Sequence, residues 1–533
     1  MKRWKPPIEI TKKEQLIMKR LGRVRTLFGF LREKRHLIFD DAFQAQLEEV
    51  YRQTGAGDEP HPPAFLCMVT LLQGYVGSSD ADAVELSVMD RRWQMVLDCM
   101  DVEEPPFSQG ALQTFRERMI AHELDRVLLE RTVALVRDAV ATKSEGQQLT
   151  KAVRVAIDSR PLAGAGRVED TINLLGHAAR NIVRVVSKIT ARHPEDICRK
   201  AGIPLLLAPS IKAGLDIDWS DPRQKAEAVA RVERQVESLT RWVERHLDDV
   251  VETPLHSLFE AVTTIRAQNL ETVGGRVQIR LGVAEDRLIS LHDTEMRHGR
   301  KSKTKRFDGY KEHIARDLDV PAIVACAVTP ANWPEEEGAA PLGADIQRQG
   351  LSLTELHIDR AYVTSSLVDA VQSDGGAIFC KPWGHRPHNR NKFSKADFKI
   401  DVRAQTITCP AGEEEPYEPG ETVQFDARAC GRCPLRAHCT DRHSGRGRLV
   451  LMSEDEPLQK RLRRLQGTSP GRAALRARVA VEHALAHIAA RKGHRARYVG
   501  ARKNLFDLRR AAALQNLEAQ QREERSDRES LPF

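Results

Sequence analysis

Apolar and polar residues alternate in two short segments that lie far apart in the chain, and both segments lead to an aspartate. In KAVRVAIDSR the alternation ends at Asp158, and in LSLTELHIDR it ends at Asp359. Alternation with a period of two is typical of a β-strand. In the first segment the following Ser, Arg and Pro are expected to stop the strand. We therefore predict two strands that each present a carboxylate at the carboxyl end, with a turn-capping Asp as the alternative for either one alone.

A third acid stands alone in a helical pattern near the end of the chain. Between Pro457 and Leu517 the only acids are Glu482 and Asp507, in a segment crowded with Arg and Lys. Helical spacing places Glu482 in the middle of ALRARVAVEHALAHIAARK, with Arg478 one turn before it. Two strand-end Asp and one helix Glu form an all-oxygen ligand set, which suits Mg²⁺ or Mn²⁺ rather than Zn²⁺. Two such ions about 4 Å apart activate an attacking oxygen and stabilise the leaving oxygen of a phosphodiester.

Most of the remaining hydrophobic pattern is helical. Residues 37–145 contain several amphipathic segments, of which ALQTFRERM is the best candidate for a DNA-facing helix, although helix packing explains it equally well. The segment QKAEAVARVERQVESLTRWVERHLDDV is a long amphipathic helix that packs within the chain or forms a coiled-coil contact. After it, RVQIRLG, DRLISLHD, YKEHIARDLD and AIVACAVTPAN predict strands in the middle of a sheet.

Basic residues are concentrated at two places in the chain. Residues 1–36 contain twelve Lys or Arg against three Glu, and residues 445–510 contain seventeen against five acids. The whole chain carries only +8, so the rest is net acidic. Such blocks indicate a polyanionic partner, with a solvated charged face as the alternative. No run of 18 apolar residues and no signal peptide is visible, so we expect a cytoplasmic protein that does not bind membranes.

Four of the nine cysteines lie close together, with the spacing C-x20-C-x2-C-x5-C. Clustered thiols in a cytoplasmic chain are more often metal ligands than disulfides, and four thiolates suit a tetrahedral structural Zn²⁺. An iron-sulfur cluster and unligated thiols are the alternatives, and His438 and His443 are possible substitute ligands. The four candidate ligands are Cys409, Cys430, Cys433 and Cys439.

These segments resemble the DDE transposases of bacterial insertion sequences, in particular the group with a Cys-bearing insert before the last catalytic Glu. The matching stretches, in chain order, are AIDSRPLAGAGRVEDTINLLG, EMRHGRKSKTKRFDGYKEHIARD, HIDRAYVTSSLV, CPLRAHCT and RVAVEHALAHIAARKGHRARYVGARKN. The resemblance implies an RNase H-like catalytic core in which Asp158, Asp359 and Glu482 bind Mg²⁺ and catalyse DNA cleavage and strand transfer.

The resemblance also implies binding to double-stranded DNA, both the terminal repeats of the element and the target, and a homodimer in the active complex. Related enzymes often carry Tyr, Arg, Glu and Lys at set spacings on the last catalytic helix. Arg478 and Glu482 fit this pattern, but Leu475 and Ala489 stand at the Tyr and Lys positions, so those contacts are absent or shifted to residues 491–492. The loop GRKSKTKRF is expected to neutralise phosphates that the carboxylates repel. The expected DNA contacts are Arg300, Lys301, Lys303, Lys305, Arg306, Lys311, Arg478, Arg491, Lys492, Arg495 and Arg497.

The predicted fold is an α/β, RNase H-like mixed-sheet core that is assembled from three separated pieces of chain. A length of 533 residues suits several such units. The three pieces of the catalytic core are expected at residues 146–169, 272–382 and 472–517. A basic arm (1–36) and a helical DNA-binding domain (37–145) precede the first piece. A helical insert (170–271) and a Cys-containing insert (383–471) separate the pieces, and a disordered tail (518–533) follows the last one.

Two other functions are compatible with the sequence. One is a metal-dependent nuclease that cuts DNA without strand transfer. The other is a transposase-derived DNA-binding protein without catalysis. All three expected carboxylates are present, so the sequence gives no support for loss of activity.

Overall fold

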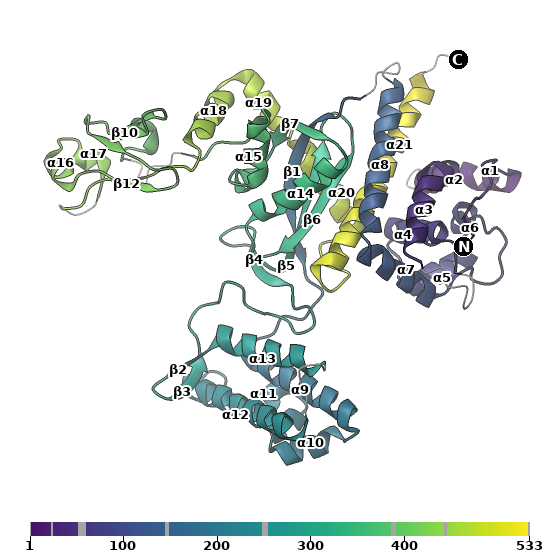
Figure 1. Ribbon diagram of the computed structural model, residues 1–533, viewed down its shortest axis with the longest axis horizontal. Coiled ribbons are helices and arrows are strands. Elements are labelled where there is room, and N and C mark those ends of the chain that lie inside the picture. Colours follow the sequence, from purple (N-terminus) through teal and green to yellow (C-terminus); the bar gives the residue numbers. More distant parts are fainter. Residues whose placement is uncertain are drawn as a thin grey trace.

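The computed structural model describes residues 2–22, 25–51, 60–143, 149–247, 254–384, 391–441 and 445–530. A central six-stranded sheet is surrounded by helices, and two smaller lobes extend from it (Figure 1). The strands of the sheet are β1 (Ala152–Ala163), β4 (Arg297–Arg300), β5 (Arg306–Asp317), β6 (Ile323–Pro330), β7 (Ser352–His357) and β8 (Ala377–Phe379).

The sheet is mixed. Its order is β6-β5-β1-β7-β8, and β4 pairs with the first residues of β5. Strands β1, β7 and β8 are parallel to one another, whereas β5 is antiparallel to β1, β4 and β6. This α/β arrangement is compatible with the expected RNase H-like core. Two of the four predicted middle strands, YKEHIARDLD and AIVACAVTPAN, contribute to it as β5 and β6.

The prediction that the first strand stops at Asp158 was wrong. Strand β1 continues to Ala163, and Asp158 lies opposite Ile314 in the ladder with β5. Pairing with β7, by contrast, ends at Ala156. The antiparallel neighbour therefore carries the strand past Pro161, which is tolerated where one edge of a strand has no ladder partner.

Helices cover the two faces of the sheet with different residues of β1. Val155 and Ile157 pack in one apolar cluster with α14 (Ala339–Arg348), α15 (Ser366–Ser373) and α18 (Glu456–Gly467). Ala156 faces the other way, toward the helices at the end of the chain. The helices of this second face are α8 (Leu124–Lys143), α20 (Val479–Lys492) and α21 (Ala501–Ser530), and α19 (Ser469–Arg476) precedes α20.

The expected basic arm is part of a folded helical region. Trp4 is buried, and the guanidinium of the buried Arg32 donates to both carboxylate oxygens of Glu14 at 2.5 and 3.1 Å. The proposed DNA-facing helix also has an internal partner, because Arg116 donates to both oxygens of Asp80 at 2.7 Å. The helices of this region are α1 (Lys12–Lys19), α2 (Thr26–Ile38), α3 (Asp41–Glu49), α4 (Pro63–Val76), α5 (Asp80–Met89), α6 (Arg91–Leu97) and α7 (Gln109–Ala121).

The N-terminal helices share one hydrophobic core with the end of the chain. Residues of α2 and α4 belong to the same buried cluster as Phe506 and Leu514 of α21. Helix α21 continues to Ser530, so the expected disordered tail is wrong up to that residue, and residues 531–533 lie outside the described range. The polar tail is ordered because it has partners: Glu518 pairs with Arg491 at 2.7 Å, and Gln521 donates to the carbonyl of Thr26 at 3.0 Å.

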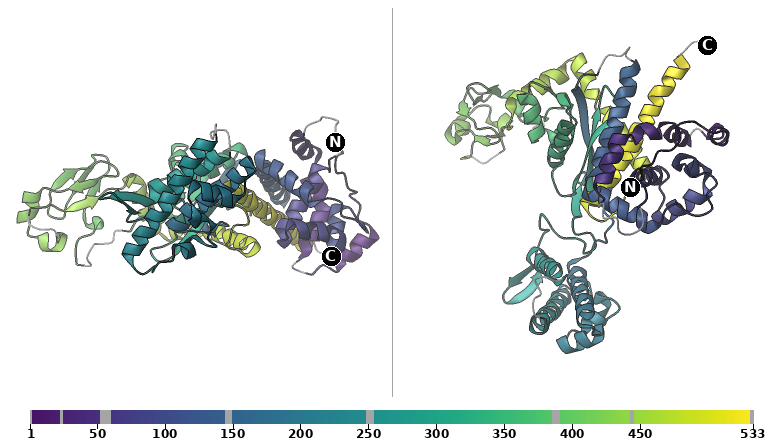
Figure 2. Two further views of the ribbon diagram at one scale, coloured as in Figure 1. Left: turned by 90° about the horizontal axis from the view of Figure 1, so that it is seen from below. Right: turned by 45° about the vertical axis from the view of Figure 1, so that its right-hand side comes forward.

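The region after β1 forms a helical lobe with its own core, which lies apart from the sheet in Figure 1 and in the right-hand view of Figure 2. Val229, Val232 and Val236 of its longest helix point into that core, so this apolar face is covered within the chain. RVQIRLG contains a strand, as predicted, but this strand pairs in a two-stranded hairpin on the lobe and not in the central sheet. The prediction of a strand in DRLISLHD was wrong. Its elements are α9 (Thr171–Thr190), α10 (Pro194–Ala201), α11 (Ile211–Leu215), α12 (Pro222–His246), α13 (Leu255–Asn269), β2 (Leu270–Val273) and β3 (Arg276–Ile279).

The second lobe carries the four clustered cysteines and has a small core around Phe398, Ile407 and Phe425. Short strands dominate it because the segment has few apolar residues and many turns. Its elements are β9 (Lys399–Asp401), β10 (Thr406–Thr408), β11 (Glu414–Pro416), β12 (Thr422–Gln424), β13 (Leu449–Leu451), α16 (Ala427–Arg432) and α17 (Arg436–Cys439). Across the described residues, no helix is long and apolar enough to cross a membrane.

The packing of the N-terminal segment gives a stability prediction. Burial raises the pKa of Glu14, but hydrogen bonds from Arg32 and Thr11 lower the pKa by more than burial raises it. The pKa of Glu14 in the folded protein is therefore below its usual value. Glu14→Gln leaves Arg32 buried without a counter-charge and should lower the free energy of unfolding by about 3 kcal/mol at pH 7. The effect should vanish as the pH falls through the pKa of Glu14. Urea unfolding at several pH values measures it.

The matched control is Glu9→Gln, because the side chain of Glu9 is exposed. This variant should change the free energy of unfolding by less than about 0.5 kcal/mol. Equal, small effects of the two substitutions would show that residues 2–22 are detached from the core in solution.

Candidate active site

The structure brings the three predicted carboxylates to one end of the sheet. Asp158 lies on β1 just beyond the end of its pairing with β7, and Asp359 follows β7 and caps a short 3₁₀ turn (Arg360–Tyr362). Parallel neighbouring strands end at the same edge, so these two residues are close. Helix α20 crosses β1 and supplies Glu482 from its first turn rather than from its middle. That position is favourable for an anion because the amino end of a helix carries partial positive charge.

Arg478 joins two of the carboxylates. Its guanidinium donates through Nη1 to Oδ2 of Asp158 at 2.7 Å and through Nη2 to Oε1 of Glu482 at 2.6 Å. The side chain of Asp158 is 17% exposed, whereas that of Glu482 is 46% exposed. The two acids therefore face a common position, and a cation of the chain itself occupies it.

The electrostatics of Asp158 place a third and a fourth acid beside it. Burial raises the pKa of Asp158, the charge of Arg478 lowers it, and the charges of Asp359 and Glu335 raise it. The pKa of Asp158 is raised overall, chiefly by its burial and further by these two neighbouring carboxylates. Asp359 is exposed, and its Oδ1 accepts a hydrogen bond from the backbone N–H of Arg360 at 2.7 Å.

Glu335 and Tyr362 were not singled out from the sequence. Glu335 begins a 3₁₀ turn (Glu335–Gly338) after β6 that packs on the turn after Asp359. The hydroxyl of the buried Tyr362 lies 2.7 Å from Nδ1 of His313, whose Nε2 lies 2.9 Å from the hydroxyl of Thr329. Burial lowers the pKa of His313 to about 3, so this ring is neutral and acts as a fixed hydrogen-bonding group. The only sequence signal was the position of Tyr362, three residues after Asp359.

The donor set fits a hard divalent cation in chemistry but is not assembled around a metal position. Carboxylate oxygens are the ligands that Mg²⁺ and Mn²⁺ prefer. In the described portion of the chain, no three His, Cys, Asp or Glu side chains are grouped to hold a metal ion. At Asp158 and Glu482 the physical reason is Arg478, which lies where an ion shared by both acids would lie.

The residues predicted to contact DNA fall into two groups. Arg300, Lys301, Lys303, Lys305 and Arg306 are exposed at the turn between β4 and β5, and none makes an ion pair with a described residue. Arg495 and Arg497, which follow α20, are also exposed, but Nη2 of Arg497 donates to the carbonyl of Gly77 at 3.1 Å. The other six side chains are available to a phosphate backbone.

Three other predicted DNA contacts have internal partners instead. Nζ of the buried Lys492 lies 2.6 Å from Glu312 and 2.9 Å from Asp507. Burial lowers the pKa of Lys492, but these two carboxylates raise it more, so the ammonium stays charged inside the protein. Arg491 pairs with the helix α21, and Lys311 donates to the carbonyl of Trp333 at 2.5 Å. The sequence could not separate these residues because charge count says nothing about burial.

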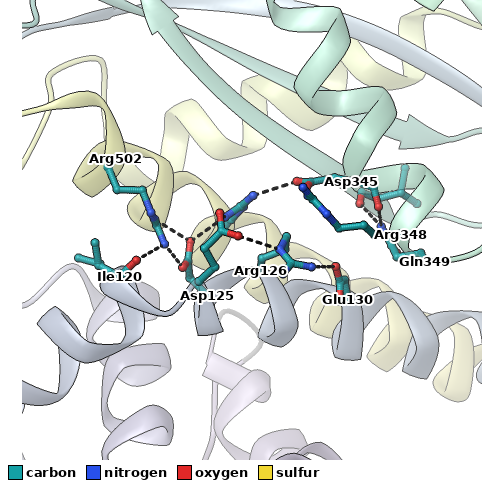
Figure 3. Close-up of polar contacts among 11 residues, drawn as sticks. Ile120, Asp125, Arg126, Glu130, Asp345, Arg348, Gln349 and Arg502 are labelled. Carbon is teal, nitrogen blue, oxygen red and sulfur yellow. Dashed lines mark hydrogen bonds and ion pairs between the residues drawn. The ribbon is translucent and has the colours of Figure 1, made fainter. Parts of the chain in front are cut away.

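A second buried charge network ties three helices together (Figure 3). Asp125 of α8 accepts from Arg502 and Arg509 of α21, and Arg509 also donates to Asp345 of α14 at 2.9 Å. Arg348 pairs with the same Asp345 at 2.7 Å. Helix α21 is thereby fastened to helices on both sides of strand β6.

The four clustered cysteines line one pocket in the small lobe. Cys409, Cys430, Cys433 and Cys439 all contribute to its wall, and none forms a disulfide. Burial raises the pKa of the Cys439 thiol, and the other three sulfurs raise it further. The residues are thus neighbours in space, as predicted, although no three of them are grouped at metal-binding geometry. Of the possible substitute ligands, His443 lies outside the described residues.

Residues 408–519 match a family model described as a transposase DDE domain. The match identifies this segment as a transposase DDE domain, which supports a DDE transposase of the insertion-sequence type. The matched segment includes Glu482 and all four clustered cysteines, whereas Asp158 and Asp359 lie before it. The searches of curated proteins and of solved structures gave no match.

The position of Arg478 gives a prediction for metal binding to this transposase. Replacing Arg478 by Gln removes the cation that competes for Asp158 and Glu482, so Mn²⁺ affinity without DNA should rise by about tenfold or more. Electron paramagnetic resonance of free Mn²⁺ measures this affinity directly. Arg476→Gln is the control, because Arg476 is exposed on the preceding helix and pairs with neither acid. Unchanged Mn²⁺ affinity in Arg478→Gln would show that Arg478 does not hold the ion position.

The cysteine pocket gives a second prediction. If the four thiolates hold one metal, the purified transposase should contain about one zinc per chain, with sulfurs about 2.3 Å from it. A chelator should then speed amide exchange in residues 399–441 and leave β1 protected, because the lobe has its own core. Cys433→Ser should lose the metal, whereas Cys99→Ser, in the N-terminal helices, should keep it. Absence of zinc or iron in metal analysis, with unchanged exchange, would leave these cysteines as ordinary core residues.

Proposed function

We propose that this transposase binds the ends of an insertion sequence and catalyses metal-dependent DNA cleavage and strand transfer. The observation that carries the proposal is the convergence of Asp158 and Glu482 on one cationic position, beside Asp359. Such a convergence costs electrostatic free energy, which a purely structural site would avoid. The family match supports the same reaction class.

Each residue has a distinct role in this mechanism. Asp158, Asp359 and Glu482 would hold divalent ions, which activate the attacking oxygen and stabilise the leaving oxygen of a phosphodiester. Arg478 must leave its two carboxylates when they take up an ion. Its guanidinium is then free to bind a DNA phosphate near the reacting bond. Glu335 adds negative charge that strengthens the attraction for cations.

The exposed basic turn between β4 and β5 supports binding of duplex DNA. Ile314, opposite Asp158, is eleven residues from Lys303 along the chain. With about 3.3 Å per residue, the tip of the turn lies at most roughly 35 Å from the carboxylates. A duplex that enters the site would therefore meet this turn within about ten base pairs of the reacting phosphate. Arg495 offers a phosphate contact closer to α20.

The first alternative function is a nuclease that cuts but does not join. A duplex with a pre-cut, 3′-hydroxyl terminal repeat separates the two functions, because only a transposase joins it to a target plasmid. The second alternative, a DNA-binding protein without catalysis, would show neither reaction.

The carboxylates give the decisive mutational prediction. Asp359→Asn and Glu482→Gln should each slow Mg²⁺-dependent cleavage of a terminal-repeat duplex more than the roughly 10- to 100-fold that outer partners of a metal contribute. DNA affinity should stay within about twofold, since these side chains serve the ions. Single-turnover cleavage and a binding titration measure the two quantities. Glu260→Gln, in the helical lobe, is the control with an exposed acid. Cleavage at the normal rate by Glu482→Gln would refute the assignment.

A further inference from the structure

The basic residues near the end of the chain fall into two sets, those that form ion pairs with acids of the protein and those that do not. Arg478, Lys492, Arg502, Arg509 and Arg510 all make ion pairs inside the protein. The basic residues of α18 differ. Lys460, Arg461 and Arg464 are exposed and make no ion pair with a described residue.

These three side chains form one wall of an open groove between α18 and the small sheet β9-β10-β11. The opposite wall contributes two more cations, Lys399 and Arg403, together with hydroxyl groups. The polar residues that line the groove are Lys399, Asp401, Arg403, Thr406, Thr408, Glu414, Lys460, Arg461 and Arg464. Five cations against two acids leave the groove net positive. Figure 1 shows α18 and α19 between this sheet and the central sheet.

The two acids of the groove do not pair with its cations. Asp401 accepts hydrogen bonds from the backbone N–H groups of Arg403 and Ala404 at 2.8 and 3.0 Å, which fixes the turn after β9. Glu414 accepts from the hydroxyl of Thr408 at 3.3 Å. Backbone hydrogen bonds and the charges of Lys460 and Arg403 lower the pKa of Asp401, but no ion pair with a described residue neutralises the cations of the α18 wall, so they can contact a ligand.

The opposite face of α18 belongs to the catalytic core. Leu458 and Leu462 are buried in the same cluster as Val155, Ile157 and Ile358, which lie beside Asp158 and Asp359. From Gly467 at the end of α18, ten residues lead to Arg478, and eight of them form α19, about 12 Å of helix. A ligand held on α18 thus has a fixed position relative to the carboxylates.

We propose that this groove binds the phosphate backbone of duplex DNA while the DNA occupies the transposase site, an inference that rests on the proposed function. Lys460 and Arg464 are one helical turn apart, so they lie side by side and can hold neighbouring phosphates. Arg403 offers a bidentate contact to phosphate oxygens, and Thr406 offers a hydroxyl donor. Arg461 donates through Nη2 to Oε1 of Gln372 and has its remaining N–H groups for a phosphate. These contacts carry no base-edge recognition, so binding at the groove is independent of sequence.

The test is a salt titration of binding with a 30-base-pair duplex of arbitrary sequence. The triple variant Lys460→Gln, Arg461→Gln and Arg464→Gln should bind at least about tenfold more weakly at 0.1 M salt. Its slope of log affinity against log salt should be shallower by about 2 to 3, because each lost phosphate contact contributes about 0.9. A second variant, Lys399→Gln with Arg403→Gln, changes the other wall and should reduce the slope by about 1 to 2.

Two control variants make the result specific. Lys188→Gln, Arg192→Gln and Lys200→Gln remove the same charge from exposed positions of the helical lobe and should leave the slope unchanged. Lys460→Arg, Arg461→Lys and Arg464→Lys keep the charge and should keep the slope. Thermal unfolding confirms that each variant is folded.

The outcomes separate this inference from the function on which it rests. If the unchanged protein binds no duplex, both proposals are wrong. If it binds but both groove variants keep its salt slope, or the helical-lobe variant loses as much, the groove is not a DNA-binding surface. The transposase proposal then stands without it.

Discussion

Repulsion among carboxylates at one end of the sheet is the constraint on which the catalytic face depends. Asp158, Asp359, Glu482 and the nearby Glu335 gather negative charge where β1 is partly shielded from water, which raises the pKa of Asp158. A single guanidinium, that of Arg478, offsets it by bonding two of them. The internal cation Arg478 therefore keeps these two acids together, and in the proposed function a divalent ion takes its place.

The acids keep that spacing because buried ion pairs hold α20 against the central sheet. Arg160, two residues after Asp158, donates to the buried Glu312 at 2.6 Å, and Glu312 also pairs with Lys492 at the end of α20. Lys492 also forms an ion pair with Asp507 of α21, and Asp507 pairs with Arg510 at 2.5 Å. Positive and negative groups alternate along this series of ion pairs, so each buried charge lies beside a charge of opposite sign. The strand of Asp158 and the helix of Glu482 are thereby locked in register.

Sequence reasoning found the three carboxylates, the helical regions and the neighbouring cysteines, because strand alternation, helical period and spacing are local properties. It failed where a distant partner decides the outcome. Strand β1 passes Asp158 because β5 pairs with it. The polar residues of α21 are ordered because they form an ion pair with Arg491 and a hydrogen bond with the carbonyl of Thr26. Lys492 was expected at DNA, yet it is buried between two acids. Arg478 was placed on the correct helical face, but its bond to Asp158 spans 320 residues and leaves no mark on the sequence.

The shared core of the first and last helices has a consequence for how the protein is made. Residues of α2 and α4 pack against α21, so part of the apolar surface of the amino-terminal region stays uncovered until α21 has been synthesised. Contacts of this sequence separation form late, and the waiting helices depend on protection from aggregation. A chain that is terminated before α21 would lack this helix, and α2 and α4 would lack the residues that pack against them. Chains that lack α21 should thus be degraded by proteases faster than chains that contain it.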